Sequence, residues 1–198
     1  MQQLPVVVRL HDKSHSWDSL LRIVADMIGA GLLGQPFICP DMVGGGEWTT
    51  FIPGSPFEEE LFIRSGQIHA LCPMMQISAS PWRYLSKENQ AIFREIVALR
   101  QRFVPMILKI AKASAVTGEP ILRSMEYNFP GQGYERIIDQ FMMGDEMVVA
   151  PQLEKGALQR EVVIPPGKWL SDNGEVITGP KKISVYTPLS RLPYFVKQ

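Results

Sequence analysis

Three short apolar runs in the first 118 residues are each followed by a stretch with helical spacing, and this alternation most constrains the fold. The runs cover residues 4–10, 36–39 and 74–77, and the helical stretches cover about residues 17–34, 55–71 and 86–118. Continuous apolar runs are typical of strands buried on both faces, and a strand–helix–strand order is typical of a parallel sheet with crossover helices. The sequence therefore predicts an α/β region.

Start and stop signals flank these helical stretches. Ser16 is a predicted N-cap, residues 55–58 form a capping box with proline at the first helical position, and Ser86 is a further N-cap. We expect Pro105 to kink or divide the last helix and Gly118 to end it.

The pattern changes after Gly118. Residues 119–198 contain no long helical stripe, and glycine, proline and aspartate turns separate short strand candidates. These candidates lie at residues 120–125, 146–151, 161–165, 182–187 and 194–196. We therefore expect two domains, an α/β domain at residues 1–118 and a small antiparallel β domain at residues 119–198.

Composition excludes several classes of partner. Twenty basic residues balance twenty acidic ones, so the chain lacks the basic excess that nucleic acid or an anionic membrane surface attracts. No apolar run is long enough for a membrane segment, and the first residues do not form a signal peptide. Cys39 and Cys72 lie in apolar stretches and are predicted to be buried free thiols, with one bridge between them left open.

Polar side chains follow the end of each predicted strand. Arg9 and Asp12 follow the first strand, Asp41 the second, and Gln76 and Ser78 the third. The carboxyl ends of parallel strands share one edge of a sheet, so we expect these side chains to line a common crevice. Tryptophans at positions 48 and 82 fall in the loops beyond, where an indole face suits the apolar face of a sugar ring, or merely covers the rim.

Three interpretations of the polar stretch at residues 11–15 stay open from spacing alone. His11, Asp12 and His15 are potential metal ligands, but no second cluster completes a coordination shell, so we predict no metal. Asp12 alone suits a general acid, which needs a partly desolvated carboxyl group at a strand end. The third interpretation is a solvated turn in which Asp12 only counters Lys13.

A resemblance that extends over most of the sequence decides between these three interpretations. The segments that carry it are HDKSHSWDSL, GLLGQPFICPDMVGG, ELFIRSGQIHALCPMMQISASPW, GEPILRSMEYNFP, DQFMMGDEMVVAPQLEKGALQREVVIPPGKW and LPYFV. In this order they resemble the acid/base segment, the later barrel strands and the C-terminal β-sandwich of glycoside hydrolase family 31, over essentially the whole chain. The resemblance implies strands 6–8 of a (β/α)8 TIM barrel with their helices, followed by a small antiparallel β-sandwich domain.

The resemblance also assigns roles by position. Asp12 falls on the acid/base aspartate of a Gly-Asp-Asn motif, with His11 in place of the glycine and Lys13 in place of the asparagine. Asp41 falls on the aspartate that ends the seventh barrel strand, close to the substrate pocket.

The remaining site residues follow from the same alignment. Gln76 and Ser78 replace an arginine and a histidine that line the sugar subsite in α-glucosidases, so a glucose-type hydrogen-bonding pattern is not expected. With these replacements the sequence resembles a branch of the family for which an α-galactoside is the expected substrate. Arg9, Trp48 and Trp82 complete the predicted substrate-binding set, and no cofactor is implied.

The resemblance implies a retaining mechanism with two carboxyl groups. The family's nucleophile is an aspartate on the fourth barrel strand, a strand that we do not find in this sequence. We therefore expect the isolated chain to be inactive, and either to self-associate or to require the rest of the barrel polypeptide. The alternative is a non-catalytic carbohydrate-binding or interaction protein built from a truncated barrel.

Overall fold

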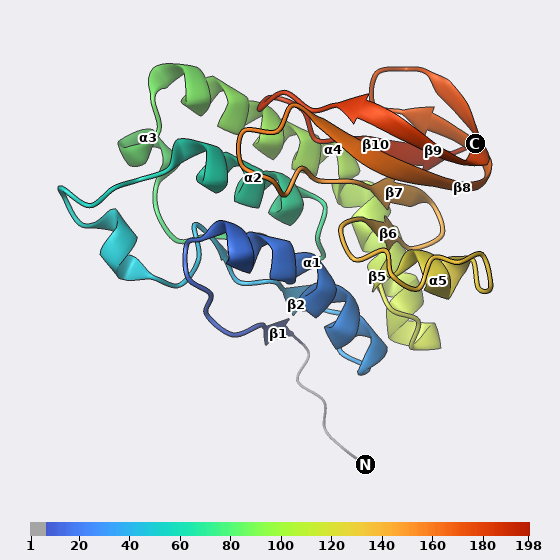
Figure 1. The fold of residues 1–198 in the computed structure, drawn as a ribbon. Helices are drawn as coiled ribbons and strands as arrows, with labels where there is room; N and C mark the ends of the chain where they lie inside the picture. The colour runs from blue at the N-terminus through green and yellow to red at the C-terminus, as the bar shows by residue number, and fades with distance from the viewer. Residues whose placement is uncertain (1–6) are drawn as a thin grey trace, which may run out of the picture.

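The computed structural model describes residues 7–198, and its N-terminal part contains short parallel strand pairs flanked by helices (Figure 1). Strand β1 (Val8–Arg9) pairs in parallel with β2 (Ile38–Cys39), and β3 (Met42–Val43) pairs in parallel with β4 (Gln76–Ile77). Helix α1 (Trp17–Leu32) joins β1 to β2, and α2 (Glu59–Ala70) joins β3 to β4. The predicted strand–helix alternation with parallel pairing is confirmed.

The first and third strands are shorter and more exposed than predicted. Residues 4–6 of the first predicted run lie outside the described residues, and Arg9 in β1 is exposed. Both residues of β4 are exposed, whereas both residues of β2 are buried. The prediction of burial on both faces is therefore wrong for β1, in which Val8 is half-buried and Arg9 is exposed.

The helix caps at Ser16 and Ser86 are confirmed. The Ser16 hydroxyl accepts a hydrogen bond from the Ser19 amide at the start of α1. Ser86 accepts in the same way from the Asn89 amide at the start of α4 (Lys87–Thr117). Gly118 ends α4 with φ of 79°, a left-handed conformation that glycine adopts without steric strain.

The predicted capping box at residues 55–58 is wrong. Helix α2 begins at Glu59, and its N-cap Glu58 makes no capping side-chain bond. Glu58 instead accepts a hydrogen bond from the Trp17 indole at 2.9 Å. The preceding Phe57 ring packs 5.8 Å from the ring of Phe51 and 5.6 Å from that of Phe62, so tertiary packing holds this segment in an extended conformation.

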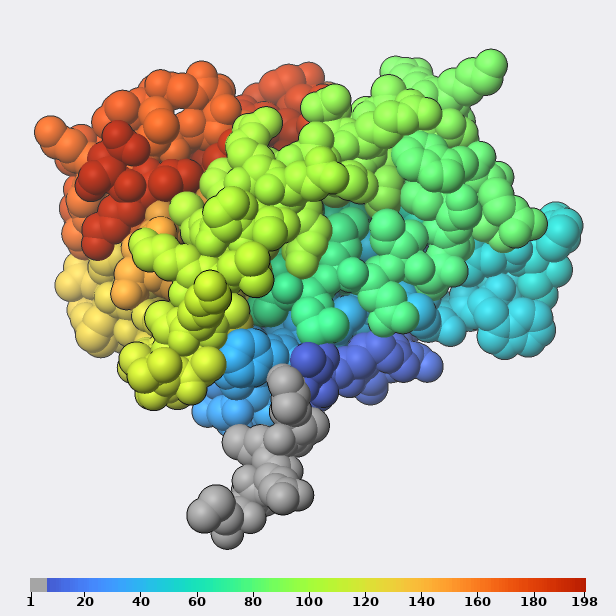
Figure 2. All heavy atoms as spheres, turned by 180° about the vertical axis from the view of Figure 1, so that it is seen from behind, coloured from blue at the N-terminus to red at the C-terminus, as the bar shows by residue number. Residues whose placement is uncertain are grey.

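Pro105 does not divide α4, which runs unbroken through it. Proline removes one amide donor, and the carbonyl that loses its partner belongs to the exposed Gln101, where water can replace the bond. Figure 2 shows α4 crossing the back of the molecule from the antiparallel sheet to the loops near η1 (Trp48–Phe51). Among residues 7–198, no helix combines the length and the apolar character that a membrane span requires.

Residues after 118 form a six-stranded antiparallel sheet with the order β5-β6-β7-β10-β8-β9. Its strands are β5 (Leu122–Arg123), β6 (Phe141–Met143), β7 (Met147–Val149), β8 (Gln159–Ser171), β9 (Val176–Tyr186) and β10 (Tyr194–Lys197). Five of them overlap the predicted strands. Strand β6 was not predicted, because its short apolar run merges with β7 across a tight turn at Gly144. The short helices α3 (Pro81–Tyr84) and α5 (Met125–Asn128) complete the fold.

The sheet curls around a core of its own. Met142 and Val148 from one end of the strand order share a hydrophobic cluster with Ile177 and Val185 from the other end. A register shift in β8 between Ile164 and Gly167 bends the long β8–β9 hairpin. This arrangement is the predicted β-sandwich domain. The division at residue 118 stays a prediction.

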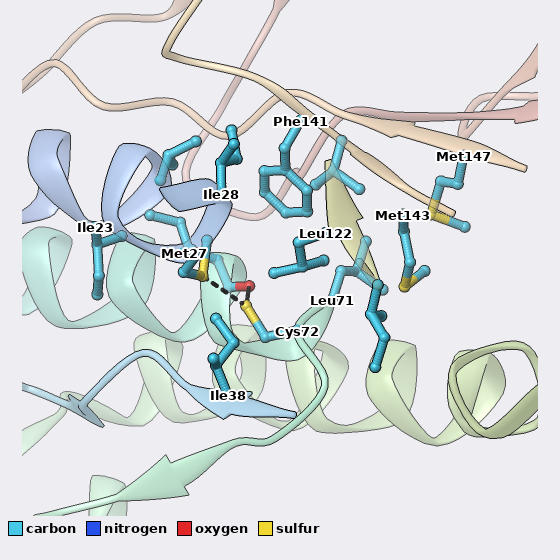
Figure 3. Close-up of a cluster of buried hydrophobic side chains, with 14 of the residues drawn as sticks. Ile23, Met27, Ile28, Ile38, Leu71, Cys72, Leu122, Phe141, Met143 and Met147 are labelled. Atoms are coloured by element: carbon cyan, nitrogen blue, oxygen red, sulfur yellow. Dashed lines mark hydrogen bonds between the residues drawn. The ribbon is translucent and has the colours of Figure 1, made fainter. Parts of the chain in front are cut away.

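The other face of the sheet belongs to a second core, which is shared with the N-terminal part (Figure 3). Phe141, Met143 and Met147 point from β6 and β7 towards Met27 of α1 and Leu71 after α2. Alternate residues of β6 therefore face opposite cores, as the pleat of a strand requires. Cys72 lies inside this shared core as a free thiol, and burial raises the pKa of its thiol group.

Two side chains of α2 hold the loop before β10. The buried Arg64 guanidinium donates to the carbonyls of Thr187 (2.8 Å), Pro188 (3.3 Å) and Arg191 (3.5 Å). Gln67 donates its side-chain amide to the carbonyl of Leu189 at 2.7 Å. These bonds tie the barrel portion to the β-sandwich by polar contacts as well as by the shared core.

The shared core predicts the effect of truncating Phe141. Replacing this fully buried ring with alanine should lower the free energy of unfolding by about 3–5 kcal/mol, because a cavity opens between the two parts of the chain. Urea denaturation followed by circular dichroism measures the change. The matched control is Ile138→Ala at an exposed position of the same segment, for which we expect little change. A Phe141→Ala value as small as that of the control would contradict the shared core.

A buried histidine makes stability depend on pH. His69 is fully buried near the end of α2, and its Nδ1 donates to the Ser65 carbonyl at 2.7 Å. Burial lowers the pKa of the His69 imidazole from its ordinary value near 6.5. The unfolded state therefore takes up this proton first as pH falls, and folding stability declines below about pH 6.5.

We therefore predict that His69→Gln flattens the pH dependence of the unfolding free energy between about pH 5.0 and 6.5. The slope should decrease by up to about 1.4 kcal/mol per pH unit, the contribution of one proton. Urea unfolding at several pH values tests this, with His11→Gln at an exposed position as control. An unchanged slope in His69→Gln would contradict the prediction.

Candidate active site

The end of β1 and the turn after β2 bring two carboxylates to one guanidinium. Nη1 of Arg9 donates to Oδ1 of Asp12 and, at 2.8 Å, to Oδ1 of Asp41. The pKa of Arg9 is raised above its ordinary value, chiefly by the hydrogen bond to Asp12. Three of the predicted site residues are thus in direct contact at the edge of the sheet where the strands end.

Asp41 is the fixed member of this group. Its side chain is 1% exposed, and its second oxygen, Oδ2, accepts from the backbone amide of Lys13 at 2.9 Å. Its φ of 133° is strained for a residue other than glycine. The Cys39 thiol donates to its carbonyl at 3.2 Å. Asp41 therefore anchors residues 9–13 from the interior of the protein and does not face solvent.

Asp12 is the accessible member, with 60% of its side chain exposed. The backbone of Gly46 lies directly against it: a Cβ atom at position 46 would stand 2.5 Å from Cβ and 2.6 Å from Cγ of Asp12. The Gly46 amide also donates to the Lys13 carbonyl at 3.0 Å. Only glycine permits this approach, so the glycine run at residues 44–46 serves to close the loop onto the Asp12 segment.

A cavity of about 370 Å³ lies beside this glycine run. Gly46 is part of its lining, and Trp48, Phe51 and Tyr84 supply aromatic walls. Trp48 is 73% exposed, on the segment that projects from the body in Figures 1 and 2. Aromatic faces next to polar side chains such as Arg83 suit a sugar, whose ring face is apolar and whose hydroxyl groups are polar.

The other predicted site residues take different positions. Ser78 lines the cavity, but its hydroxyl donates to the Val43 carbonyl at 2.7 Å. Gln76 is partly exposed in β4 and does not line the cavity. The Arg94 guanidinium lies 4.8 Å from the centre of the Trp82 ring, which leaves less of the indole free for a ligand.

Among the cavity-lining residues that sequence reasoning missed are Phe51, Arg83 and Tyr84. Arg83 and Tyr84 follow the predicted Trp82 in the short helix α3, and Phe51 lies three residues after the predicted Trp48 in η1. Proximity in sequence to the two tryptophans was therefore the available signal for all three.

The histidines do not form a metal site. The His15 ring stacks on Phe51 at 5.8 Å with an angle of 18° between planes, and burial lowers the pKa of its imidazole. No group of three or more His, Cys, Asp or Glu side chains suited to a metal ion occurs within residues 7–198. His15 therefore belongs to an aromatic cluster beneath the cavity.

Comparison with known families agrees with this architecture. The family model "Glycosyl hydrolases family 31 TIM-barrel domain" matches residues 1–110, and the model "Glycosyl hydrolase family 31 C-terminal domain" matches residues 118–198. The first match covers more than half of the chain.

Curated relatives are also similar over most of the chain. The myogenesis-regulating glycosidase of Mus musculus is 38% identical over 184 residues, which are 88% of this chain and 26% of the relative. The SITS-binding protein of Tetronarce californica is 30% identical over 98% of this chain and 29% of its own length. The chain thus spans somewhat more than a quarter of the length of these relatives.

Solved structures give the same result. A GH31 α-xylosidase from a soil metagenome, complexed with xylose, has a TM-score of 0.86 and 26% identity over 96% of this chain and 32% of its own. The cycloalternan-forming enzyme from Listeria monocytogenes, in complex with a pentasaccharide substrate, has a TM-score of 0.87 and 25% identity over 96% of this chain and 19% of its own. In sequence and in fold, the chain belongs to glycosyl hydrolase family 31.

Proposed function

We propose that this chain supplies the acid/base carboxylate, Asp12, of a retaining α-glycosidase that hydrolyses O-glycosidic bonds. The observation that carries the proposal is the position of Asp12: it is exposed shortly after β1, and it lies against the backbone of Gly46, which also lines a cavity with aromatic walls. Membership of glycosyl hydrolase family 31 supports the reaction class.

In this mechanism Asp12 acts twice. As an acid it donates a proton to the glycosidic oxygen while the bond to the anomeric carbon breaks and a second carboxylate attacks that carbon. As a base it then removes a proton from the water that hydrolyses the glycosyl-enzyme intermediate. An exposed carboxylate at a strand end suits both steps, because the leaving group and the water reach it from the same side.

We further propose that the nucleophilic carboxylate comes from polypeptide outside these 198 residues. A retaining enzyme needs the two carboxyl groups about 5–5.5 Å apart and both facing the anomeric carbon. Asp41 is the carboxylate that shares Arg9 with Asp12, but it is buried and both of its oxygens accept hydrogen bonds. It is therefore unsuited to attack a sugar, and the isolated chain should be inactive.

The partner that we propose is the rest of a barrel, with self-association as the alternative. Strands β1 and β4 each pair with one strand only among residues 7–198, and the neighbouring Val7 and Ile77 are exposed. Further parallel strands would cover these edges. The match with this chain covers 26% and 29% of the length of the two curated relatives. The rest of such a protein is long enough to supply further strands.

For the substrate we propose an α-glycoside, and specifically an α-galactoside. Solved relatives were obtained with xylose and with a pentasaccharide, which supports a carbohydrate ligand. Glutamine at position 76 and serine at position 78 replace the charged side chains expected for glucose recognition. In this proposal Ser78 lines the sugar subsite and Trp48 faces the ring, while Arg9 and Asp41 hold Asp12 from beneath; Gln76 and Trp82 lie outside the cavity.

A second candidate function is carbohydrate binding without catalysis. The exposed indole of Trp48 and the cavity beside it belong to this chain alone and require no nucleophile. A sugar held there would be bound by ring stacking and left unhydrolysed.

Asp12 provides the test of the catalytic proposal. The 198-residue chain should release no nitrophenol from nitrophenyl α-galactoside or α-glucoside, whereas the full-length gene product should release it from the galactoside. Asp12→Asn in the full-length protein should lower kcat/KM by about 10²–10⁴-fold, the usual contribution of a general acid or base. Absorbance of released nitrophenolate measures both.

The control for this experiment is Asp18→Asn, at an exposed aspartate in the first turn of α1, which should leave the rate unchanged. In Asp12→Ala, added azide should restore turnover, because this small anion attacks the intermediate without a general base. Hydrolysis by the 198-residue chain that Asp12→Asn abolishes would refute the proposed external nucleophile. Full activity of Asp12→Asn in the complete protein would refute the acid/base role.

Trp48 provides the test of sugar binding. Trp48→Ala should weaken binding of a galactoside by about 5–30-fold, since loss of an aromatic contact removes roughly 1–2 kcal/mol. Trp82→Ala should have a smaller effect, because that ring is outside the cavity and is covered by Arg94. Isothermal titration calorimetry on the full-length Asp12→Asn protein separates binding from turnover. Equal effects of the two substitutions would count against the cavity as the sugar site.

A further inference from the structure

We infer that Arg9 is a positioning residue that anchors Asp12 to the buried Asp41 and thereby holds the Asp12 carboxyl group where it can transfer a proton. This inference rests on the proposed function, in which Asp12 is the acid/base group. It assigns Arg9 a role through another residue instead of a contact with substrate.

The first step of the argument is that one end of the Asp41–Arg9–Asp12 chain of contacts is fixed. Asp41 is held by the Lys13 amide at 2.9 Å, by the Arg9 guanidinium at 2.8 Å and by burial. Because this carboxylate cannot turn towards water, the bond it accepts determines where the Arg9 guanidinium lies.

The second step is that Asp12, at the other end of this chain of contacts, is held by Arg9. Asp12 accepts its side-chain hydrogen bond from the same Nη1 atom, and 60% of its side chain is exposed. Gly46 limits movement of Asp12 on the side towards the cavity. Arg9 is thus the side chain that joins an exposed, reactive carboxylate to an immobile one.

The third step concerns the charges that face Asp12. The Arg9 cation and the Asp41 anion lie closest, since both are in this chain of contacts. Lys13 turns away, and its ammonium group pairs with Asp26 at 3.2 Å. Glu47, beyond Gly46, accepts from the His15 amide at 3.3 Å, and His11 is exposed next to Asp12. Removal of Arg9 would therefore leave Asp12 beside the negative charge of Asp41.

The chemical consequence concerns the position of the reacting carboxyl group. Without Arg9, the Asp12 carboxylate loses its hydrogen bond to the guanidinium and is repelled by the Asp41 anion, so it turns away from its present position. A general acid must lie within hydrogen-bond reach of the oxygen that it protonates. Arg9 therefore matters most for a leaving group that must receive a proton as its bond breaks.

The test compares kcat/KM of the full-length Arg9→Met protein for two substrates. For an alkyl α-galactoside, whose leaving group must receive a proton, kcat/KM should fall by about 10²-fold, within the usual contribution of a general acid. For a dinitrophenyl α-galactoside, whose leaving group needs no proton, kcat/KM should change little. Arg9→Lys, which keeps a cationic donor, should restore most of the rate with the alkyl substrate.

Two further variants keep the result interpretable. Arg9→Met/Asp41→Asn removes the buried charge that Arg9→Met leaves unpaired, so it gives the comparison if the single variant does not fold; it should show the same selective loss of rate with the alkyl substrate. Arg22→Met, at an exposed arginine of α1, is the matched control and should leave kcat/KM for both substrates unchanged.

Equal losses of kcat/KM for the two substrates in Arg9→Met, or in the double variant, would overturn the inference and leave Arg9 a structural residue. The proposed function fails separately, if Asp12→Asn retains wild-type turnover of the same two substrates. A loss confined to the alkyl substrate in Arg9→Met, together with loss of turnover in Asp12→Asn, supports both.

Discussion

Phe141, Met143 and Met147 point from the antiparallel sheet into the core that α1 and α2 also fill, and the rest of the structure depends on this contact. Each parallel strand of the N-terminal part contains only two residues, so strand pairing alone cannot stabilise that part. The sheet supplies the apolar surface that they lack. The β-sandwich is therefore a structural support for the strand ends at which Asp12 and Asp41 lie.

At those strand ends the conformation of the backbone is determined by two close contacts. The buried Asp41 accepts from the Lys13 amide, and the Gly46 amide donates to the Lys13 carbonyl. Both peptide groups of Lys13 are thereby held, and Asp12, its neighbour, inherits a defined position although its own side chain is exposed. An exposed functional side chain on a firmly held backbone is an arrangement suited to proton transfer, since the group is accessible without being mobile.

Local signals in the sequence predicted the features that depend on few neighbours. The caps at Ser16 and Ser86 and the left-handed Gly118 are stabilised within one helical turn, so their residue types suffice. The strand–helix alternation and most β strands likewise follow from periodicity. The capping box at residues 55–58 failed because Phe57 packs against rings from other segments, and no local pattern contains that information.

The site was predictable in its location more than in its contacts. Strand ends indicated where Arg9, Asp12 and Asp41 would meet, and the family resemblance indicated which of them reacts. The sharing of one guanidinium between two carboxylates depends on the pairing of β1 with β2, which brings residues 32 positions apart into contact. The cavity residues Phe51 of η1 and Tyr84 of α3 are 33 positions apart, and only the folded chain brings them together.

The hydrogen bonds from Arg64 and Gln67 have a consequence for how this molecule tolerates change. Every acceptor that they use in the segment from Thr187 to Arg191 is a main-chain carbonyl. These bonds therefore depend on the path of the backbone between Thr187 and Arg191 and not on its side chains. An insertion or deletion in this segment would move the carbonyls out of reach of the two side chains on α2. The side chains of Thr187 and Arg191 have partners of their own within the β-sandwich, in Gln152 and Asp172.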